Sequence, residues 1–163
     1  MIEIVIVMAV AGILLTIATL RFGAWTEKTG IENEIKQMYS DLMEARIRAI
    51  GSNRYHFVTL AATQYNIYDD TDSNVGTLET GTDTLIPLQG KGALKYPITL
   101  SPPANTQIYF DQDGLANLAS GNTPPDTVIS VLSNTVGAAY DCISITLTKI
   151  YMGRMTNGAC IQK

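Results

Sequence analysis

The amino-acid sequence predicts an α+β fold in which one long N-terminal helix packs against a C-terminal antiparallel β-sheet body. Three observations predict it: an uncharged apolar run near the start of the chain, an amphipathic stretch after it, and alternating apolar residues in the remainder. At 163 residues the chain has the length of one ordinary domain. We expect an apolar membrane or filament-core helix over 1–25, the amphipathic half of the same helix over 26–50, and a β-rich body over 51–163.

The first element is the run from Ile4 to Leu20, seventeen residues without a charge, which as a helix is about 25 Å long. This length is at the low end of a bilayer crossing, and the run lacks the polar face of a surface helix. We therefore expect a helix that needs lipid or other helices around it, in preference to one buried inside a globular domain. Glu3 either interacts favourably with the helix dipole or forms an ion pair with a cation of another subunit.

The second element, residues 26 to 50, is predicted as the amphipathic continuation of the same helix. Its apolar residues recur at spacings of three and four and form one stripe: Ile31, Ile35, Met38, Leu42, Ala45 and Ala49. Charged residues on the other faces are interpreted mainly as a solvated surface, with subunit contacts as the weaker alternative. Because no proline precedes Pro87 and Gly51-Ser52-Asn53 supplies a stop, we expect one helix over residues 2 to 50.

The third element is the body after Gly51, where apolar residues begin to alternate as they do in strands. The expected strands are Tyr55 to Leu60, Gln64 to Tyr68, Ile98 to Leu100, Gln107 to Phe110, Val128 to Leu132 and Cys142 to Ile150. Stretches rich in small polar residues, glycine and proline predict loops over residues 69 to 84, 101 to 106 and 117 to 127. An antiparallel sheet is expected to cover the apolar stripe of the helix.

Composition excludes several classes of function. Eleven Lys and Arg against fifteen Asp and Glu give a formal charge of −4, which argues against broad electrostatic capture of nucleic acid or anionic lipid. With one histidine, His56, and two cysteines, Cys142 and Cys160, the chain cannot assemble a Cys/His zinc cluster or a haem-attachment motif. His56 lies in an expected strand and is interpreted as a structural residue rather than a metal ligand or a base. We expect no enzyme activity and no cofactor.

Three short motifs in the body match known sites only in part. Asp70 to Asn74 matches the first ligand positions of an EF-hand loop, but Val75 and Gly81 replace its glycine and its glutamate, so a polar loop is favoured over a calcium site. Residues 111 to 114, Asp-Gln-Asp-Gly, are predicted as a hairpin turn rather than as paired catalytic carboxylates. Gly90-Lys91-Gly92 lacks the other residues of a phosphate-binding loop.

Four stretches carry a resemblance to a known family. MIEIVIVMAVAGILL resembles the start of mature type IV pilins and type II secretion pseudopilins, whose pattern is Phe-Thr-Leu-Ile-Glu-Leu followed by an apolar helix. DLMEARIRAIGSNRYHFVTL, residues 41 to 60, resembles the helix-to-strand junction of the GspH/FimT type of minor pilins and pseudopilins. FDQDGLANLASGN and DCISITLTKIYMGRMTNG resemble parts of the GspH/FimT body. The resemblance implies the pilin ladle fold.

The resemblance also implies roles for particular residues. Met1, Ile2, Glu3 and Ile4 match Leu-Ile-Glu-Leu, so Glu3 takes the place of the glutamate that, in this family, faces the methylated amino terminus of a neighbouring subunit and guides assembly. The expected helix-helix packing residues are Ile4, Val7, Met8, Ala11, Gly12, Leu15, Phe22 and Trp25. The family's first two mature residues and its basic leader are absent, so we expect either that this sequence begins two residues inside the mature protein or that its cleavage site is unusual.

Two further features follow from the comparison with pilins. Many pilins carry a proline at the position of Leu20, and its absence here leaves open whether the helix melts between Gly12 and Leu20. The resemblance implies an exported body, and in an oxidising compartment Cys142 and Cys160 are expected to form a disulfide rather than remain two buried thiols. This bond would resemble the C-terminal disulfide loop of many pilins.

The expected function is that of a structural subunit in a type IV pilus-like extracellular filament, built from copies of this chain through their apolar helices. Membrane lipid, a prepilin peptidase and an inner-membrane assembly platform are the expected partners before assembly. The alternative is a minor pilin or pseudopilin of a type II secretion or DNA-uptake machine, which would be periplasmic. A membrane-anchored calcium-dependent adhesin using loop 69 to 84 belongs to another class. Nucleic acid is not an expected partner, because Arg154 and Lys163 are only two cations in an acidic body.

Overall fold

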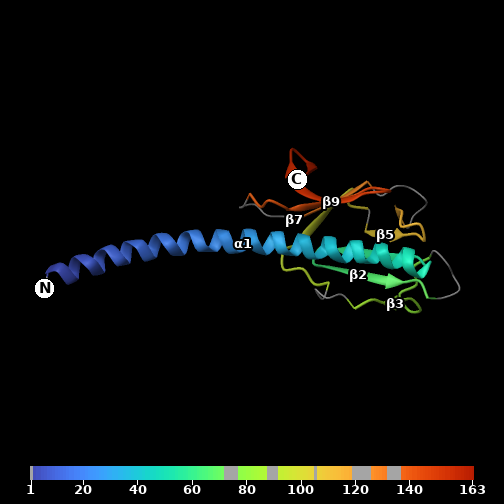
Figure 1. Cartoon of the computed structure of the whole chain (residues 1–163), viewed down its shortest axis with the longest axis horizontal. Helices are drawn as coiled ribbons and strands as arrows, with labels where there is room; N and C mark the ends of the chain where they lie inside the picture. The colour runs from blue at the N-terminus through green and yellow to red at the C-terminus, as the bar shows by residue number, and fades with distance from the viewer. Residues whose placement is uncertain (1, 72–76, 88–91, 105, 119–125, 132–136) are drawn as a thin grey trace.

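One helix, α1 (Ile2–Ser52), runs along the whole long axis of the molecule, and the β-rich body surrounds only its C-terminal half (Figure 1). This computed structural model describes residues 2–163 except 72–76, 88–91, 105, 119–125 and 132–136, and for residues 14–22 it describes only the backbone. At 51 residues, α1 is about 76 Å long. The predicted fold class is confirmed: a long helix joined to an antiparallel β-sheet body, as in the pilin ladle fold.

The apolar stripe predicted for the second half of α1 is the face that the body covers. Each of its six residues is at most 1% exposed: Ile31, Ile35, Met38, Leu42, Ala45 and Ala49. The helix ends where Asn53 adopts a left-handed conformation (φ 55°) and the Arg54 N–H donates to the Ala49 carbonyl (3.2 Å) in a Schellman cap. Gly51 and Ser52 are therefore still helical, two residues beyond the expected end.

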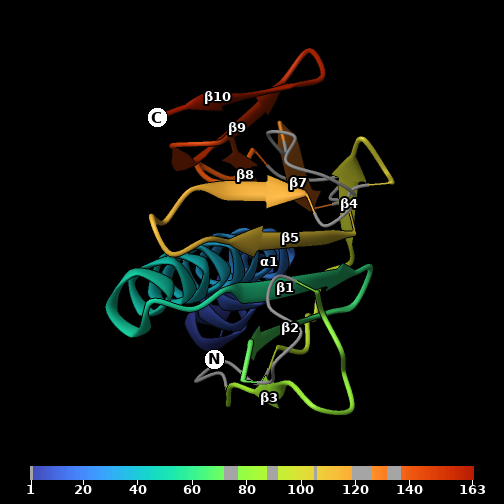
Figure 2. The same ribbon diagram turned by 90° about the vertical axis from the view of Figure 1, so that its right-hand side faces the viewer.

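Within the described residues the body forms two five-stranded antiparallel sheets (Figure 2). The strands of the first sheet, in spatial order, are β3 (Thr84–Leu85), β2 (Gln64–Asp69), β1 (His56–Ala61), β5 (Gln107–Phe110) and β6 (Ala116–Leu118). Those of the second are β10 (Ala159–Gln162), β9 (Ile150–Thr156), β8 (Cys142–Ile145), β7 (Thr127–Val131) and β4 (Ile98–Ser101). The Ala116 N–H donates to the Leu147 carbonyl (2.9 Å) and thereby joins the two sheets.

Both sheets contribute to one core with the stripe of α1. Val58 and Ile108 of the first sheet and Ile129 and Ile143 of the second are fully buried in the same apolar cluster as the helix residues. Figure 2, which looks along α1, shows the helix beside the strands of both sheets. Burial of this apolar area is the main favourable term in folding, so the second half of α1 is part of the body's core.

The strand predictions differ from the structure in several places. Cys142 to Ile150, expected as one strand, is β8, a turn and the start of β9, because the Thr146 N–H donates to the Lys149 carbonyl (2.8 Å) and closes a hairpin. Asn117 and Leu118, expected in a loop, belong to β6 and pair with β5. The strands β3 and β10, and the part of β9 that follows Ile150, were not predicted. The end of the strand predicted over 128–132 lies at Leu132, outside the described residues.

Candidate assembly surface

The first half of α1 extends away from the body and exposes its apolar side chains (Figure 1). Among the predicted packing residues, Ile4, Val7 and Met8 are 63%, 65% and 70% exposed. Ala11, Gly12 and Trp25 are also exposed, whereas the side chains of Leu15 and Phe22 lie outside those that the structure describes. A contiguous exposed apolar surface of this kind marks an interaction site. The alternative of a helix buried in the chain's own globular domain is therefore wrong.

Glu3 lies in the first turn of α1 and is exposed. Its carboxylate is close to the N-terminal end of the helix, where the dipole favours negative charge. Across the residues described, no helix has the combination of length and apolarity that a bilayer crossing demands. The roles of Glu3 and of the packing residues in assembly stay predictions.

A loop from the first half of the body clamps α1 where the exposed half ends. The Tyr96 N–H lies 3.4 Å from both carboxylate oxygens of Glu34, and the Tyr96 ring lies so close to Gly30 that an added Cβ would come within 2.6 Å of its hydroxyl. Lys95 Nζ lies 5.2 Å from the centroid of the same ring. Burial raises the pKa of Glu34 above its ordinary value of 4.5, although the Tyr96 N–H and Lys95 oppose this shift.

A second loop holds the same stretch of α1. The Ala139 N–H donates to Glu32 Oε1 (2.7 Å), and Lys36 Nζ lies 5.6 Å from the centroid of the Tyr140 ring. Hydrogen bonds from neutral donors to a carboxylate are stronger than those between neutral groups. The two loops therefore fix residues 30–36 of the helix in the body, and they set the point where the exposed half begins.

A buried carboxylate ties α1 to β2. Asp41 is 3% exposed, and its two oxygens accept from the Tyr65 hydroxyl (2.5 Å) and the Gln37 amide (2.9 Å). Burial and the neighbouring Asp41 carboxylate raise the pKa of Tyr65 far above its ordinary value of 10. The prediction of a solvated charged face is thus wrong for Glu32, Glu34 and Asp41, whose partners lie in the body.

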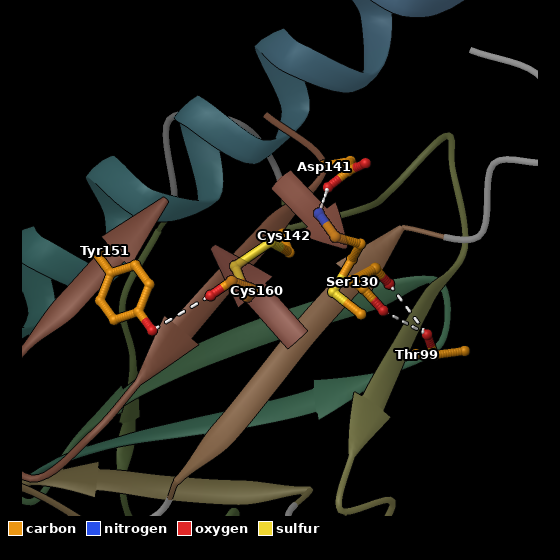
Figure 3. Close-up of a disulfide and its surroundings, with 7 residues drawn as sticks. Thr99, Ser130, Asp141, Cys142, Tyr151 and Cys160 are labelled. Carbon is orange, nitrogen blue, oxygen red and sulfur yellow. Dashed lines mark hydrogen bonds between the residues drawn. A yellow bond between two sulfur atoms is a disulfide. The ribbon is translucent and has the colours of Figure 1, made fainter. Parts of the chain in front are cut away.

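The predicted disulfide is present between Cys142 of β8 and Cys160 of β10 (Figure 3). These strands are not neighbours, because β9 lies between them and Gly153 pairs with both Cys142 and Gln162. An added Cβ at Gly153 would overlap the Ile161 carbonyl oxygen and lie 3.0 Å from Cys160 Sγ. Glycine at this position therefore lets the disulfide pass over the middle strand.

Hydrogen bonds around the disulfide hold the same three strands. Asp141 Oδ1 accepts from the Met155 N–H (2.6 Å). The Tyr151 hydroxyl donates to the Cys160 carbonyl (3.4 Å), as Figure 3 shows. On the other side of β8, the hydroxyls of Thr99 and Ser130 lie 2.9 Å apart and link β4 to β7. The end of the second sheet is thus fixed by one covalent bond and several polar contacts.

The turn predicted at residues 111 to 114 is confirmed. Asp111 Oδ1 accepts from the N–H groups of Asp113 (3.0 Å) and Leu115 (2.8 Å), and Gly114 has a φ of 75°. This turn joins β5 to β6 and lies against Ile50 at the end of α1. The Asp111 carboxylate is occupied by the backbone of its own turn, as expected for a structural rather than a catalytic residue.

His56 begins β1 and borders a groove of about 510 Å³ between the end of α1 and β3. Its ring is 2% exposed, and Nε2 lies 3.9 Å from Asp69 Oδ1. Burial lowers the pKa of His56 below its ordinary value of 6.5, although Asp69 opposes this shift. Arg48 lines the same groove but is paired with Glu44 at 2.6 Å. The Ser52 hydroxyl, which lines the same groove, donates to the Arg48 carbonyl (2.7 Å).

The partial EF-hand match and the Gly-Lys-Gly motif lie mainly outside the described residues, at positions 72–76 and 88–91. Among the residues that the structure describes, no group of three or more His, Cys, Asp or Glu side chains is arranged to hold a metal ion. Sequence reasoning missed the clamp residues Tyr96 and Ala139, since the groups that contact α1 are backbone N–H groups of distant loops.

Comparison with known proteins identifies one family. A family model described as type II transport protein GspH matches residues 34–148, which is well over half of the chain. No curated protein and no solved structure matches the sequence. The matched segment contains the buried stripe of α1 from Ile35 onwards, the first sheet and the β8–β9 turn. The chain therefore belongs to the GspH family of type II transport proteins.

Proposed function

We propose that this protein is a minor pilin-like subunit, a pseudopilin, that assembles with other pseudopilins into the filament of a type II secretion machine. It catalyses no reaction. The observation that carries this proposal is the exposed apolar half of α1, which the body leaves uncovered from Ile2 to at least Ile13. The match to the GspH family supports the same conclusion from the other part of the chain.

The physical mechanism that we propose is an exchange of surroundings for the apolar half of α1. In the inner membrane its side chains would be covered by lipid, and in the filament by the equivalent helices of neighbouring subunits. Because lipid tails and apolar helices are similarly nonpolar, close packing and polar contacts rather than the hydrophobic effect would favour the assembled state. The body, held to residues 30–36 by its two loops, would then form the outer, periplasmic surface of the filament.

Glu3 would supply the polar contact that sets the register between subunits. A carboxylate among apolar helices is costly unless it meets a cation, and the amino terminus of a neighbouring subunit is a cation at the correct end of the helix. The other partners in this proposal are a prepilin peptidase and an assembly platform in the inner membrane. The same proposal includes the division of the chain near residue 25 into an apolar helix for assembly and a remainder that belongs to the body.

The family match favours a pseudopilin over the filament-forming pilus subunit that the sequence first suggested. The two differ in copy number, because a major subunit forms most of a filament whereas a minor one is present in few copies. Quantitative mass spectrometry of purified filaments distinguishes them: a small fraction of this chain relative to another pilin-like subunit supports the proposal. A filament made mainly of this chain would restore the first interpretation.

Substitution of Glu3 tests the assembly role. In Glu3→Gln and Glu3→Ala, loss of the intersubunit ion pair is expected to reduce incorporation into the filament fraction by at least about tenfold. Glu44→Gln is the matched control, since Glu44 is an exposed acid of α1 whose partner Arg48 is on the same helix. Circular dichroism of each variant checks that the body remains folded. Normal incorporation of both Glu3 variants would overturn the role assigned to this carboxylate.

A further inference from the structure

An open cleft of about 500 Å³ lies at the tip of the β9–β10 hairpin, remote in sequence from the exposed half of α1. Its lining combines two cations with apolar and small polar side chains: Arg154, Met155, Thr156, Asn157, Ile161 and Lys163. The hairpin is the end of the second sheet, and β10 has no strand on its outer side among the residues described. The residues that line this cleft lie outside α1 and outside the segment matched by the family model, which ends at residue 148.

The cleft is built on a rigid support. Asn157 and Gly158 have φ angles of 51° and 82°, the left-handed pair that a tight two-residue hairpin turn requires. The disulfide anchors Cys160 of β10 to β8, so the two strands that line the cleft cannot separate from the sheet. Arg154 is also positioned from outside the hairpin, because a Cβ at Gly137 would lie only 2.9 Å from its Nη2. A ligand would therefore meet a preformed surface.

Neither cation of the cleft has a carboxylate partner in the part of the chain that the structure describes. In the described part of the chain, Arg54 lies 3.7 Å from Asp69 and Arg48 lies 2.6 Å from Glu44, whereas no carboxylate lies within ion-pair distance of Arg154 or Lys163. In a chain with a formal charge of −4, two neighbouring cations without an internal partner mark a site for an external anion.

The remaining lining residues indicate which kind of anion fits. Two cations are few for nucleic acid, whose binding depends on the neutralisation of several phosphates. Ile161 is 52% exposed and offers an apolar contact. A phosphate backbone does not use such a contact, whereas an apolar side chain of a polypeptide does. Addition of a complete strand to β10 is disfavoured, because the Tyr151 hydroxyl already donates to the Cys160 carbonyl. The cleft would therefore recognise a polypeptide through the side chains of that polypeptide.

We propose that this cleft binds an acidic side chain and an adjacent apolar side chain from a neighbouring subunit of the filament. The guanidinium of Arg154, held against Gly137, receives the carboxylate, and Ile161 packs against the apolar neighbour. This inference rests on the proposed pseudopilin function for the identity of the partner. It adds a second contact between subunits, at the surface of the filament instead of among its helices.

Fluorescence anisotropy with the full chain in a neutral detergent tests the cleft directly. The probes are a labelled peptide of alternating glutamate and leucine and a labelled oligothymidine of equal charge. The peptide is expected to bind, and Arg154→Gln and Ile161→Ser are each expected to weaken its binding by about tenfold. The matched control is Arg48→Gln, which removes a cation that already has a partner on its own helix and should leave binding unchanged.

Three results would overturn the proposal: no binding of the peptide, equal binding by wild type and Arg154→Gln, or tighter Arg154-dependent binding of the oligothymidine. The last would assign the cleft to nucleic acid. Because this assay needs no filament, its failure is separable from failure of the proposed function. If the peptide binds but Glu3→Ala is incorporated normally, only the assembly role of Glu3 falls. If the peptide does not bind but Glu3→Ala blocks incorporation, only the cleft proposal falls.

Discussion

His56 is a titratable residue whose behaviour is set by burial. The ring is 2% exposed, its Nδ1 lies 3.5 Å from the Arg54 carbonyl, and Asp69 is too far from Nε2 for a good hydrogen bond. Loss of hydration disfavours the imidazolium more than the Asp69 carboxylate favours it, so the pKa of His56 falls below 6.5. The folded protein therefore holds a neutral histidine where the unfolded chain would take up a proton.

This shift predicts the direction of a pH effect. Between pH 6.5 and the lower folded pKa, the unfolded state binds more protons, so the free energy of unfolding decreases as the pH falls through this window. The contribution of the neutral His56 ring to the free energy of unfolding is fully present above pH 6.5. Thermal unfolding of the wild type and His56→Gln, followed by circular dichroism from about pH 7.5 to about pH 5, measures it. The variant should lose less stability on acidification, and parallel curves would contradict the prediction.

Other single residues show where prediction from the sequence reaches its limit. The buried stripe was predictable because helical spacing is local: Ile31 and Ile35 lie one turn apart whatever the rest of the chain does. The contacts of Glu32 and Glu34 could not be predicted, because the N–H groups that donate to these carboxylates belong to residues 107 and 62 positions away in the chain. An acid on a polar helix face has the same local pattern whether water or a distant backbone N–H covers it.

At the scale of elements, the second sheet was the least predictable part of the body. Cys142 to Ile150 forms a nearly unbroken run of strand-forming residues, and the hairpin that divides it depends on hydrogen bonds between Thr146 and Lys149. The last strand did have a local signal, the Asn157-Gly158 pair, which is the strongest short-range indication of a hairpin. Its flanking segments are short and partly polar, so alternation alone did not mark β10 as a strand.

The crossing of the disulfide over β9 predicts a sensitive position. Gly153→Ala places a methyl group against the Ile161 carbonyl and Cys160 Sγ, and it should destabilise the protein by about 1–3 kcal/mol because the backbone cannot move away. Gly51→Ala is the control, since an added Cβ there meets nothing within 4 Å in a helical segment and should stabilise by about 0.5–1 kcal/mol. Thermal unfolding under oxidising conditions measures both. Equal stability of Gly153→Ala and wild type would contradict the crossing.

At the scale of the whole molecule, the two halves of α1 have different energetic roles. The second half contributes six fully buried residues to the core, whereas the first half makes its apolar surface available to other molecules. The fold class and this division of the helix could be predicted because both depend on the distribution of apolar residues along the chain. The arrangement of ten described strands in two sheets could not, because it depends on pairings between distant segments.

This division predicts that the body is stable without the first half of the helix. A chain that lacks residues 2–24 should have a melting temperature within about 3 °C of that of the full chain, because none of the described residues of the apolar core lies in the deleted segment. This shorter chain should also no longer need detergent, because its exposed apolar helix is gone. Thermal unfolding and size-exclusion chromatography check these expectations. A large fall in melting temperature would mean that the exposed half contributes to the stability of the body.

The cap at Asn53 and the buried stripe make α1 one continuous rod with no proline between its exposed tip and the core of the body. A pull or push applied to the exposed tip would consequently reach the core of the body through one helical element. In the proposed filament, a force on this tip would therefore act on the whole body through its core rather than on one strand at its edge.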